Sequence, residues 1–130
     1  MKKLEIEKLV NVMKKLRDPK NGCPWDKKQT MESIIPHTIE EVYEVAEQIY
    51  SKDYLNLKEE LGDLLFQVIY LSQIASEKKK FNFKDVVTTI TSKMINRHPH
   101  VFKNKKFKNL NEIKKWWEDS KNKKKLSILD

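Results

Sequence analysis

Two groups of carboxylates in this sequence have the spacing needed to bind a metal ion. The first is Glu40-Glu41-x-x-Glu44, and the second is Glu60-x-x-Asp63. On a helix, residues three or four positions apart lie on one face, with Cβ atoms about 5–6 Å apart. If two such helices pack antiparallel, four or five carboxylates share one space, and their repulsion calls for a divalent cation. Oxygen ligands without a supporting cysteine suit Mg²⁺, with Mn²⁺ as a substitute.

These carboxylates also have a simpler interpretation. Thr38-x-x-Glu41 fits a capping box, which would place Glu41 at a helix end. Glu40, Glu41 and Glu44 lie opposite the apolar face of their helix, where solvated glutamates are common. Glu60 falls on the shoulder of the apolar stripe of its helix, where a carboxylate is desolvated unless something binds it. Spacing alone leaves the metal site and the solvated surface both open.

Helical periodicity dominates the elements that must position these side chains. Helices are predicted over residues 3–16, 38–51, 54–77, 83–96 and 111–122, and a short piece over 29–35 ends before Pro36. The segment Cys23-Pro24-Trp25-Asp26 is predicted to be an irregular loop, and no strand pattern is present. The prediction is an all-α fold, a compact antiparallel four-helix-type bundle with a short additional C-terminal helix. Residues 1–122 are expected to form one domain and residues 123–130 a short lysine-rich tail.

The helix expected over residues 54–77 is apolar most of the way round. Its main stripe includes Leu61, Leu64 and Val68, and Ile69 and Tyr70 fall on the far side. A helix apolar on both sides is buried on both, so one side is expected to be a subunit interface of a homodimer. Gly62 in this helix costs about 1 kcal/mol relative to alanine, which indicates close approach by a ligand or a neighbouring helix.

Composition excludes several classes of protein. Of the 130 residues, 38% are hydrophobic and 35% are charged, too apolar a mixture for a disordered chain. No uncharged apolar run approaches the roughly 18–20 residues that cross a bilayer. The single cysteine, Cys23, permits no internal disulfide. We therefore expect a cytoplasmic protein with no membrane partner.

The net charge of +8 is unevenly distributed. Ten lysines between residues 103 and 125 face three acidic residues, whereas residues 29–51 hold five glutamates and no Lys or Arg. An acidic helix kept free of bases favours an external cation. The lysines permit a different class of function, a basic nucleic-acid-binding helical module with steeply salt-dependent binding. That alternative leaves the acidic helix unexplained, so nucleic acid is not the expected partner.

Four segments together resemble the MazG family of nucleoside triphosphate pyrophosphohydrolases in order and spacing. They are Cys23-Pro24-Trp25-Asp26, Glu40-Glu41-x-x-Glu44, the run from Glu59 to Gln67, and Arg97-His98-Pro99-His100-Val101-Phe102. The resemblance implies an all-α, Mg²⁺-dependent hydrolase that cleaves nucleoside triphosphates to nucleoside monophosphate and pyrophosphate, a nucleotide-clearing activity. A related enzyme with a narrower substrate, similar to dUTPases or to phosphoribosyl-ATP pyrophosphatases, remains an alternative.

The resemblance also implies roles for individual residues. Glu41, Glu44, Glu60 and Asp63 would ligate Mg²⁺, and the catalytic carboxylates would be Glu41 and Glu40, the latter as a further ligand or as the group that orients the attacking water. The substrate would be bound by a second set of residues. These are Lys93 and Arg97 on the triphosphate, Trp117 and Lys121 of a Trp-Glu-x-x-Lys element, and Trp25 and Asp26 in the loop near the base or the metal.

Overall fold

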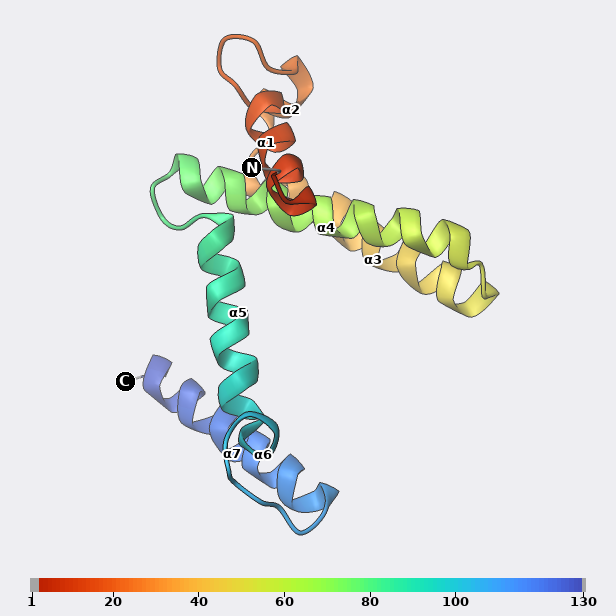
Figure 1. Cartoon of the computed structure of the whole chain (residues 1–130). Coiled ribbons are helices and arrows are strands. Elements are labelled where there is room, and N and C mark those ends of the chain that lie inside the picture. The colour runs from red at the N-terminus through yellow and green to blue at the C-terminus, as the bar shows by residue number, and fades with distance from the viewer. Residues whose placement is uncertain (1–2, 130) are drawn as a thin grey trace. The chain divides into compact units, whose positions relative to one another are not determined.

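A computed structural model describes residues 3–129, with side chains as far as Lys123. The predicted lysine-rich tail spans residues 123–130, so all of its side chains after Lys123 lie outside those described. Within residues 3–129 the chain is helical with no strand, which confirms the all-α prediction (Figure 1). The helices are α1 (Glu5–Leu16), α2 (Pro24–Lys28), α3 (Met31–Ser51), α4 (Tyr54–Glu77), α5 (Phe83–Arg97), α6 (Pro99–Phe102) and α7 (Leu110–Leu129).

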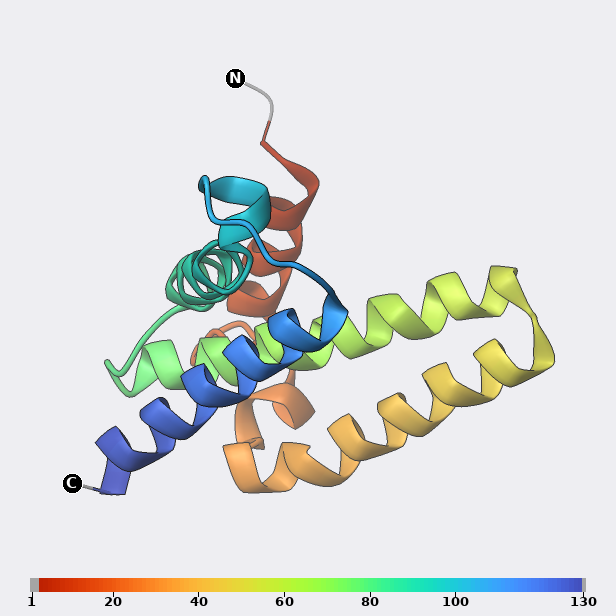
Figure 2. The same cartoon turned by 90° about the horizontal axis from the view of Figure 1, so that it is seen from below.

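The chain divides into two compact units, Met1–Val86 and Val87–Asp130. In the first unit α3 and α4 form a long antiparallel pair joined by a tight turn, as both views show (Figures 1 and 2), and α1 packs on α4. Residues from these three helices form the core at the end of the pair that is remote from the turn. They are Met13 of α1, Ile34 of α3, and Ile69, Tyr70 and Ile74 of α4.

Helix α3 begins earlier than the sequence predicts. Thr30 is its N-cap: the Thr30 hydroxyl accepts from the Ser33 amide at 3.1 Å, and the Ser33 hydroxyl accepts from the Thr30 amide at 2.8 Å. The predicted break before Pro36 and the capping box at Thr38 are both wrong, because the helix runs through Pro36. An exposed proline near a helix start removes one hydrogen bond, and burial of Ile34, 1% exposed, offsets that loss.

The apolar faces of the α3/α4 pair are used differently from the prediction. The buried positions of α4 include Ile69 and Tyr70, which the sequence placed on the far side of its main stripe. Side chains nearer the turn are largely exposed instead, and we call this surface the open half of the pair. It comprises Ile39, Val42, Tyr43, Ile49 and Tyr50 of α3, and Tyr54, Leu55, Leu61, Leu65 and Val68 of α4.

The segment predicted as an irregular loop contains the short helix α2. Pro24 stands at its first turn, where a missing amide proton costs nothing. The preceding turn brings backbone very close to Gly22: a Cβ there would lie 2.4 Å from the Leu16 carbonyl oxygen. Glycine is therefore required at this position, and α2 is folded back against the end of α1.

The second unit contains the rest of α5 together with α6 and α7. Helix α7 is longer than the short C-terminal helix predicted over residues 111–122. Edge-to-face and tilted aromatic contacts, with ring centroids 5.1–6.1 Å apart, connect the end of α5 with α6 and α7. The rings are His98, His100, Phe107, Trp116 and Trp117. None of the described helices is both long and apolar enough to cross a bilayer.

Candidate functional site

Three of the four predicted metal ligands meet between α3 and α4. One carboxylate oxygen from each of Glu41, Glu60 and Asp63 lies within 4.8 Å of the others. Glu41 comes from α3, and the other two come from successive turns of one face of α4. The antiparallel pairing of the two acidic helices creates this arrangement, which we call the carboxylate cluster.

A polar contact one turn away sets the register of the two helices. The Thr38 hydroxyl of α3 donates to the side-chain oxygen of Gln67 on α4, at 3.1 Å. Thr38 stands three residues before Glu41, and Gln67 stands four residues after Asp63, so this bridge lies on the same faces as the cluster. The bridge ties the cluster to the core end of the pair.

The cluster is electrostatically unfavourable without a cation. Burial raises the pKa of Glu41 to about 7, and the negative charges of Asp63, Glu60 and Glu44 add to the effect. The pKa of Glu60 is also raised, first by desolvation and then by neighbouring carboxylates. Glu41 Oε2 is buried without a hydrogen-bond partner among the described residues. This combination of crowded carboxylates and an unpartnered oxygen fits a divalent cation bound by hard oxygen ligands.

Glu44 and Glu40 lie further from this group. Glu44 is half-buried on α3 and raises the pKa of both Glu41 and Glu60, although none of its oxygens falls within the 4.8 Å group. Glu40 is exposed. Glu44 thus affects the charge of the carboxylate cluster from outside it, and Glu40 faces solvent.

Asp26, predicted near the base or the metal, points into the protein. The Tyr70 hydroxyl lies 2.9 Å from Asp26 Oδ1 and 3.0 Å from the Asp26 carbonyl oxygen, and it donates to this pair. Tyr70 is 2% exposed. Its burial, followed by the hydrogen bond to Asp26, raises the pKa of the Tyr70 hydroxyl above its usual range. Asp26 therefore links α2 to the core of the first unit.

Arg17 holds the same segment from the other side. Its guanidinium donates to both Glu77 oxygens at 2.8 Å, and also to the carbonyl oxygens of Asp26 and Gln29. The Arg17 side chain is only 7% exposed, and its guanidinium carbon lies 5.7 Å from the centre of the Tyr70 ring. The hydrogen bonds from Arg17 lower the pKa of Glu77. Arg17 thus joins Glu77, whose own side chain is 38% exposed, to the backbone on both sides of Lys27 and Lys28.

Trp25, the neighbour of Asp26, faces outward. Its side chain is 52% exposed, and its ring meets the His37 ring of α3 edge to face, with centroids 5.6 Å apart. His37 lies four residues before Glu41, so the two side chains share one face of α3. The accessible indole thus contacts a residue that lies one helical turn before Glu41.

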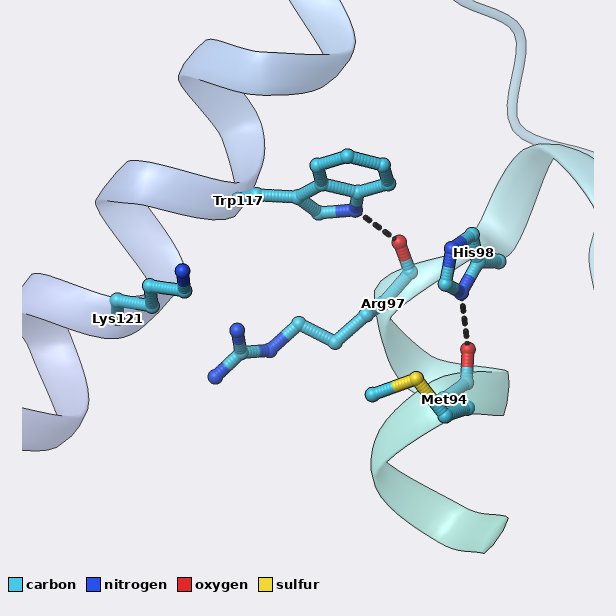
Figure 3. A pocket seen from close by; sticks show the side chains of 5 residues that line it. All are labelled: Met94, Arg97, His98, Trp117 and Lys121. Atoms are coloured by element: carbon cyan, nitrogen blue, oxygen red, sulfur yellow. Dashed lines mark hydrogen bonds between the residues drawn. The ribbon is translucent and has the colours of Figure 1, made fainter. Parts of the chain in front are cut away.

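In the second unit, an open hollow of about 220 Å³ is lined by Met94, Arg97, His98, Trp117 and Lys121. Figure 3 shows the Arg97 and Lys121 side chains reaching into the same space beside the Trp117 ring. The Trp117 indole nitrogen donates to the Arg97 carbonyl oxygen and joins α7 to the end of α5. Two cations beside an aromatic ring suit a phosphorylated ligand.

Three of the predicted substrate-binding residues therefore meet in this hollow, namely Arg97, Trp117 and Lys121. Lys93 lies one turn earlier on α5, half-buried, and is not among the lining residues. The adjacent Trp116 does not line the hollow and instead contacts Phe107 and Lys105.

The fold and the site define a class of protein: an all-α protein in which two antiparallel helices bring together carboxylates that could hold a metal ion. Residues 29–102 match the model of the MazG nucleotide pyrophosphohydrolase domain, and the chain belongs to this family.

Curated relatives carry names that agree with this family. A protein of Escherichia coli strain K12 named nucleoside triphosphate pyrophosphohydrolase is 47% identical over 117 residues, which are 90% of this chain and 44% of that protein. A Thermotoga maritima protein named nucleoside triphosphate pyrophosphohydrolase/pyrophosphatase MazG is 53% identical over 97 residues, 75% of this chain and 38% of that protein. The chain thus spans less than half the length of these relatives.

A solved structure shares the fold. The crystal structure of a mazG-related protein from Thermotoga maritima superposes with a TM-score of 0.72 and 28% sequence identity, covering 89% of this chain and 98% of that one. This similarity extends beyond the segment matched by the family.

Sequence reasoning missed the residues that support the site. Arg17, Tyr70 and Gln67 were given no role in the site. Arg17 and Tyr70 contact the predicted residue Asp26, and Gln67 contacts Thr38 on the same face of α3 as Glu41. Only the spacing of Gln67, four residues after Asp63 on one helix face, offered a signal. Tyr70 and Arg17 reach Asp26 through the tertiary fold, which no local pattern reveals.

Proposed function

We propose that this chain hydrolyses nucleoside triphosphates between the α- and β-phosphates, releasing nucleoside monophosphate and pyrophosphate. The carboxylate cluster is the observation that carries the proposal, since three carboxylates from facing helices suit an ion that binds phosphates. Membership of the MazG family and the printed names of the relatives support the same reaction.

The cofactor we propose is Mg²⁺, with Mn²⁺ as a substitute, held by Glu41, Glu60 and Asp63 with Glu44 completing the set. When bound, such an ion neutralises charge on the carboxylates and on the phosphates and activates the nucleophile. Glu40, exposed one position before Glu41, orients the attacking water. Water adds to the α-phosphorus and its proton is released to solvent, the bond from this phosphorus to the oxygen shared with the β-phosphate breaks, and pyrophosphate leaves with that oxygen.

Six further residues are proposed to form the substrate site, five by contact and Asp26 by holding its neighbour Trp25. Lys93 and Arg97 balance the negative charge of the triphosphate, and the hollow beside Arg97 supports this assignment through its second cation, Lys121. Trp117 supplies an aromatic wall to that hollow. Trp25 and Asp26 lie in α2, which contacts α3 through the Trp25 and His37 rings. We assign this segment to the nucleobase end of the substrate.

We also propose that residues 1–122 act as one MazG-like domain and that two copies form a homodimer. The match over residues 29–102 includes parts of both compact units, which supports a single functional domain. The open half of the α3/α4 pair supports the homodimer, because exposed apolar side chains on two adjacent helices favour burial against another surface.

Product analysis on a panel of ribo- and deoxyribonucleoside triphosphates tests the reaction. We expect nucleoside monophosphate and pyrophosphate with Mg²⁺, and no turnover with EDTA. Glu60→Ala should abolish the reaction, whereas Glu59→Gln, an exposed neighbour outside the cluster, should retain it. Release of orthophosphate and nucleoside diphosphate would contradict the proposed site of cleavage.

A further inference from the structure

Trp25 carries an exposed indole on a short helix, so contacts from other elements must hold the indole in position. Helix α2 has five residues, Pro24–Lys28, and contributes no buried residue of its own. It cannot hold Trp25 by packing. The contacts that fix it come from outside, from Tyr70 on α4 and from Arg17 just after α1, and both converge on Asp26.

The polar groups of Tyr70 and Arg17 both bind the α2 segment. Tyr70 is among the most buried side chains of the described residues, and its hydroxyl donates to the carboxylate and carbonyl oxygens of Asp26. Arg17 is held in place by the bidentate pair with Glu77, which leaves one nitrogen to bind the Asp26 and Gln29 carbonyls. Burying the Arg17 and Tyr70 polar groups is costly unless their partners are in place, so these contacts restrain the segment.

The geometry of Trp25 indicates what this restraint is for. The edge contact with His37, which lies one helical turn before Glu41, leaves about half of the indole accessible. A nucleobase attached to a triphosphate bound at that cluster has a π-face, and stacking on an aromatic ring accepts any base. A restrained and accessible Trp25 ring beside His37 is suited to stacking on a base.

We propose that Tyr70 and Arg17 are positioning residues for nucleobase recognition: through Asp26 they hold Trp25 against His37, where the indole stacks on the base. Asp26 then acts through Trp25 and does not itself contact the substrate. This inference rests on the proposed function, because it requires a nucleotide at the carboxylate cluster.

Fluorine NMR of the 5-fluorotryptophan-labelled protein tests the inference directly. The chain has three tryptophans, and Trp25→Phe identifies the Trp25 resonance. With Mg²⁺, a non-hydrolysable α,β-methylene analogue of ATP should shift this resonance, whereas tripolyphosphate, which lacks a base, should leave it in place. Equal shifts with both ligands, or no shift with either, would overturn the stacking role.

The positioning role is tested with Tyr70→Phe, which removes the hydroxyl and keeps the ring. We expect the affinity for the ATP analogue to fall about tenfold and the affinity for tripolyphosphate to stay within about twofold. The matched control is Ser76→Ala, which removes an exposed hydroxyl from the same helix as Tyr70 and should change neither affinity. Equal weakening of both ligands would indicate a purely structural role and overturn the inference.

Two substitutions at Asp26 provide an independent reading, used alone if Tyr70→Phe fails to fold by thermal melting. Asp26→Asn keeps an oxygen acceptor for Tyr70 and should preserve most of the affinity for the analogue, whereas Asp26→Ala should reproduce the selective loss. Identical behaviour of the two variants would count against the inference. Failure of the wild-type chain to release pyrophosphate from any nucleotide would instead overturn the proposed function, and the Trp25 resonance reports separately from that outcome.

Discussion

At the scale of single residues, Glu41 determines how the proposed site responds to its surroundings. Its carboxyl is half-buried, one of its oxygens has no partner in the described part of the chain, and its pKa is raised to about 7. A proton and a divalent cation are therefore alternative ways to relieve the same repulsion. The choice between them falls within the physiological range of pH.

The first prediction concerns metal affinity. Because metal ligation requires the ionised carboxyl, competition with a proton of pKa about 7 should make Mg²⁺ bind about tenfold more weakly at pH 6 than at pH 8. Calorimetric titration at pH 6, 7 and 8 measures this dependence. Glu47→Gln, an exposed glutamate on α3 outside the cluster, should keep the same slope. An affinity that does not vary with pH would contradict the role of Glu41.

The second prediction concerns stability without metal. The folded-state pKa of Glu41 lies above its ordinary value of 4.5, so its contribution to stability is present at low pH and is lost as pH rises toward 7 and above. Glu60→Ala removes one of the repelling carboxylates. It should therefore abolish activity while leaving the metal-free protein folded, with a melting temperature at pH 8 at least equal to that of the wild type. A large loss of melting temperature would indicate that Glu60 is structural.

At the scale of elements, the α3/α4 pair does most to build the site. It brings Glu41 opposite Glu60 and Asp63, and the Thr38–Gln67 bridge fixes the register. Gly62 stands beside these ligands, and a Cβ built on it meets no described atom within 4 Å. Close packing within the described chain therefore does not explain this glycine.

The third prediction follows from that open space. Gly62→Ala should stabilise the isolated chain by about 0.5–1 kcal/mol, because alanine loses less backbone entropy in a helix. Denaturant unfolding monitored by circular dichroism measures this gain. If the open space serves a substrate or a second chain, kcat/KM or dimer affinity should fall in the same variant. A destabilised monomer would contradict the open environment.

Local sequence patterns predicted most of the helices, and they failed where tertiary contacts determine the structure. Helix α4 has the predicted bounds because Asp53 caps it, accepting from the Asn56 amide at 3.1 Å. The carboxylate spacing likewise identified residues that the fold brings together. The start of α3 was missed because the rule for Pro36 ignores burial of Ile34 in the core. The Tyr70–Asp26 contact was out of reach, since it joins positions 44 residues apart.

At the scale of the whole molecule, the open half of the α3/α4 pair exposes more apolar side chains than a helical pair in a monomer needs to. Tyr43, Tyr50, Tyr54 and Leu55 are each more than 70% exposed, and they come from both helices around the turn. Apolar side chains in that number favour association. The assignment of this surface to a homodimer can be tested without reference to activity.

The fourth prediction therefore places charge on that surface. Ile49→Glu combined with Leu65→Glu should weaken self-association at least about tenfold, because a carboxylate buried at an apolar interface is strongly disfavoured. Sedimentation velocity over a range of concentrations measures the change. Ser76→Glu, an exposed position on α4 near the core end, serves as the control and should leave association unchanged. A double variant that associates as tightly as the wild type would exclude this surface as the interface.

The position of the core at one end of the α3/α4 pair has a consequence for the timescale of local opening. Backbone amides flanking Ile34, Ile69 and Ile74 should exchange with solvent only through global unfolding, whereas amides near the turn at Lys52 open by fraying. The carboxylate cluster lies between the core end of the pair, where exchange is slow, and the turn, where the helices fray. An ion bound there would join the two helices at midlength and slow hydrogen exchange on the turn side, so that amide protection would record how much of the protein carries its metal.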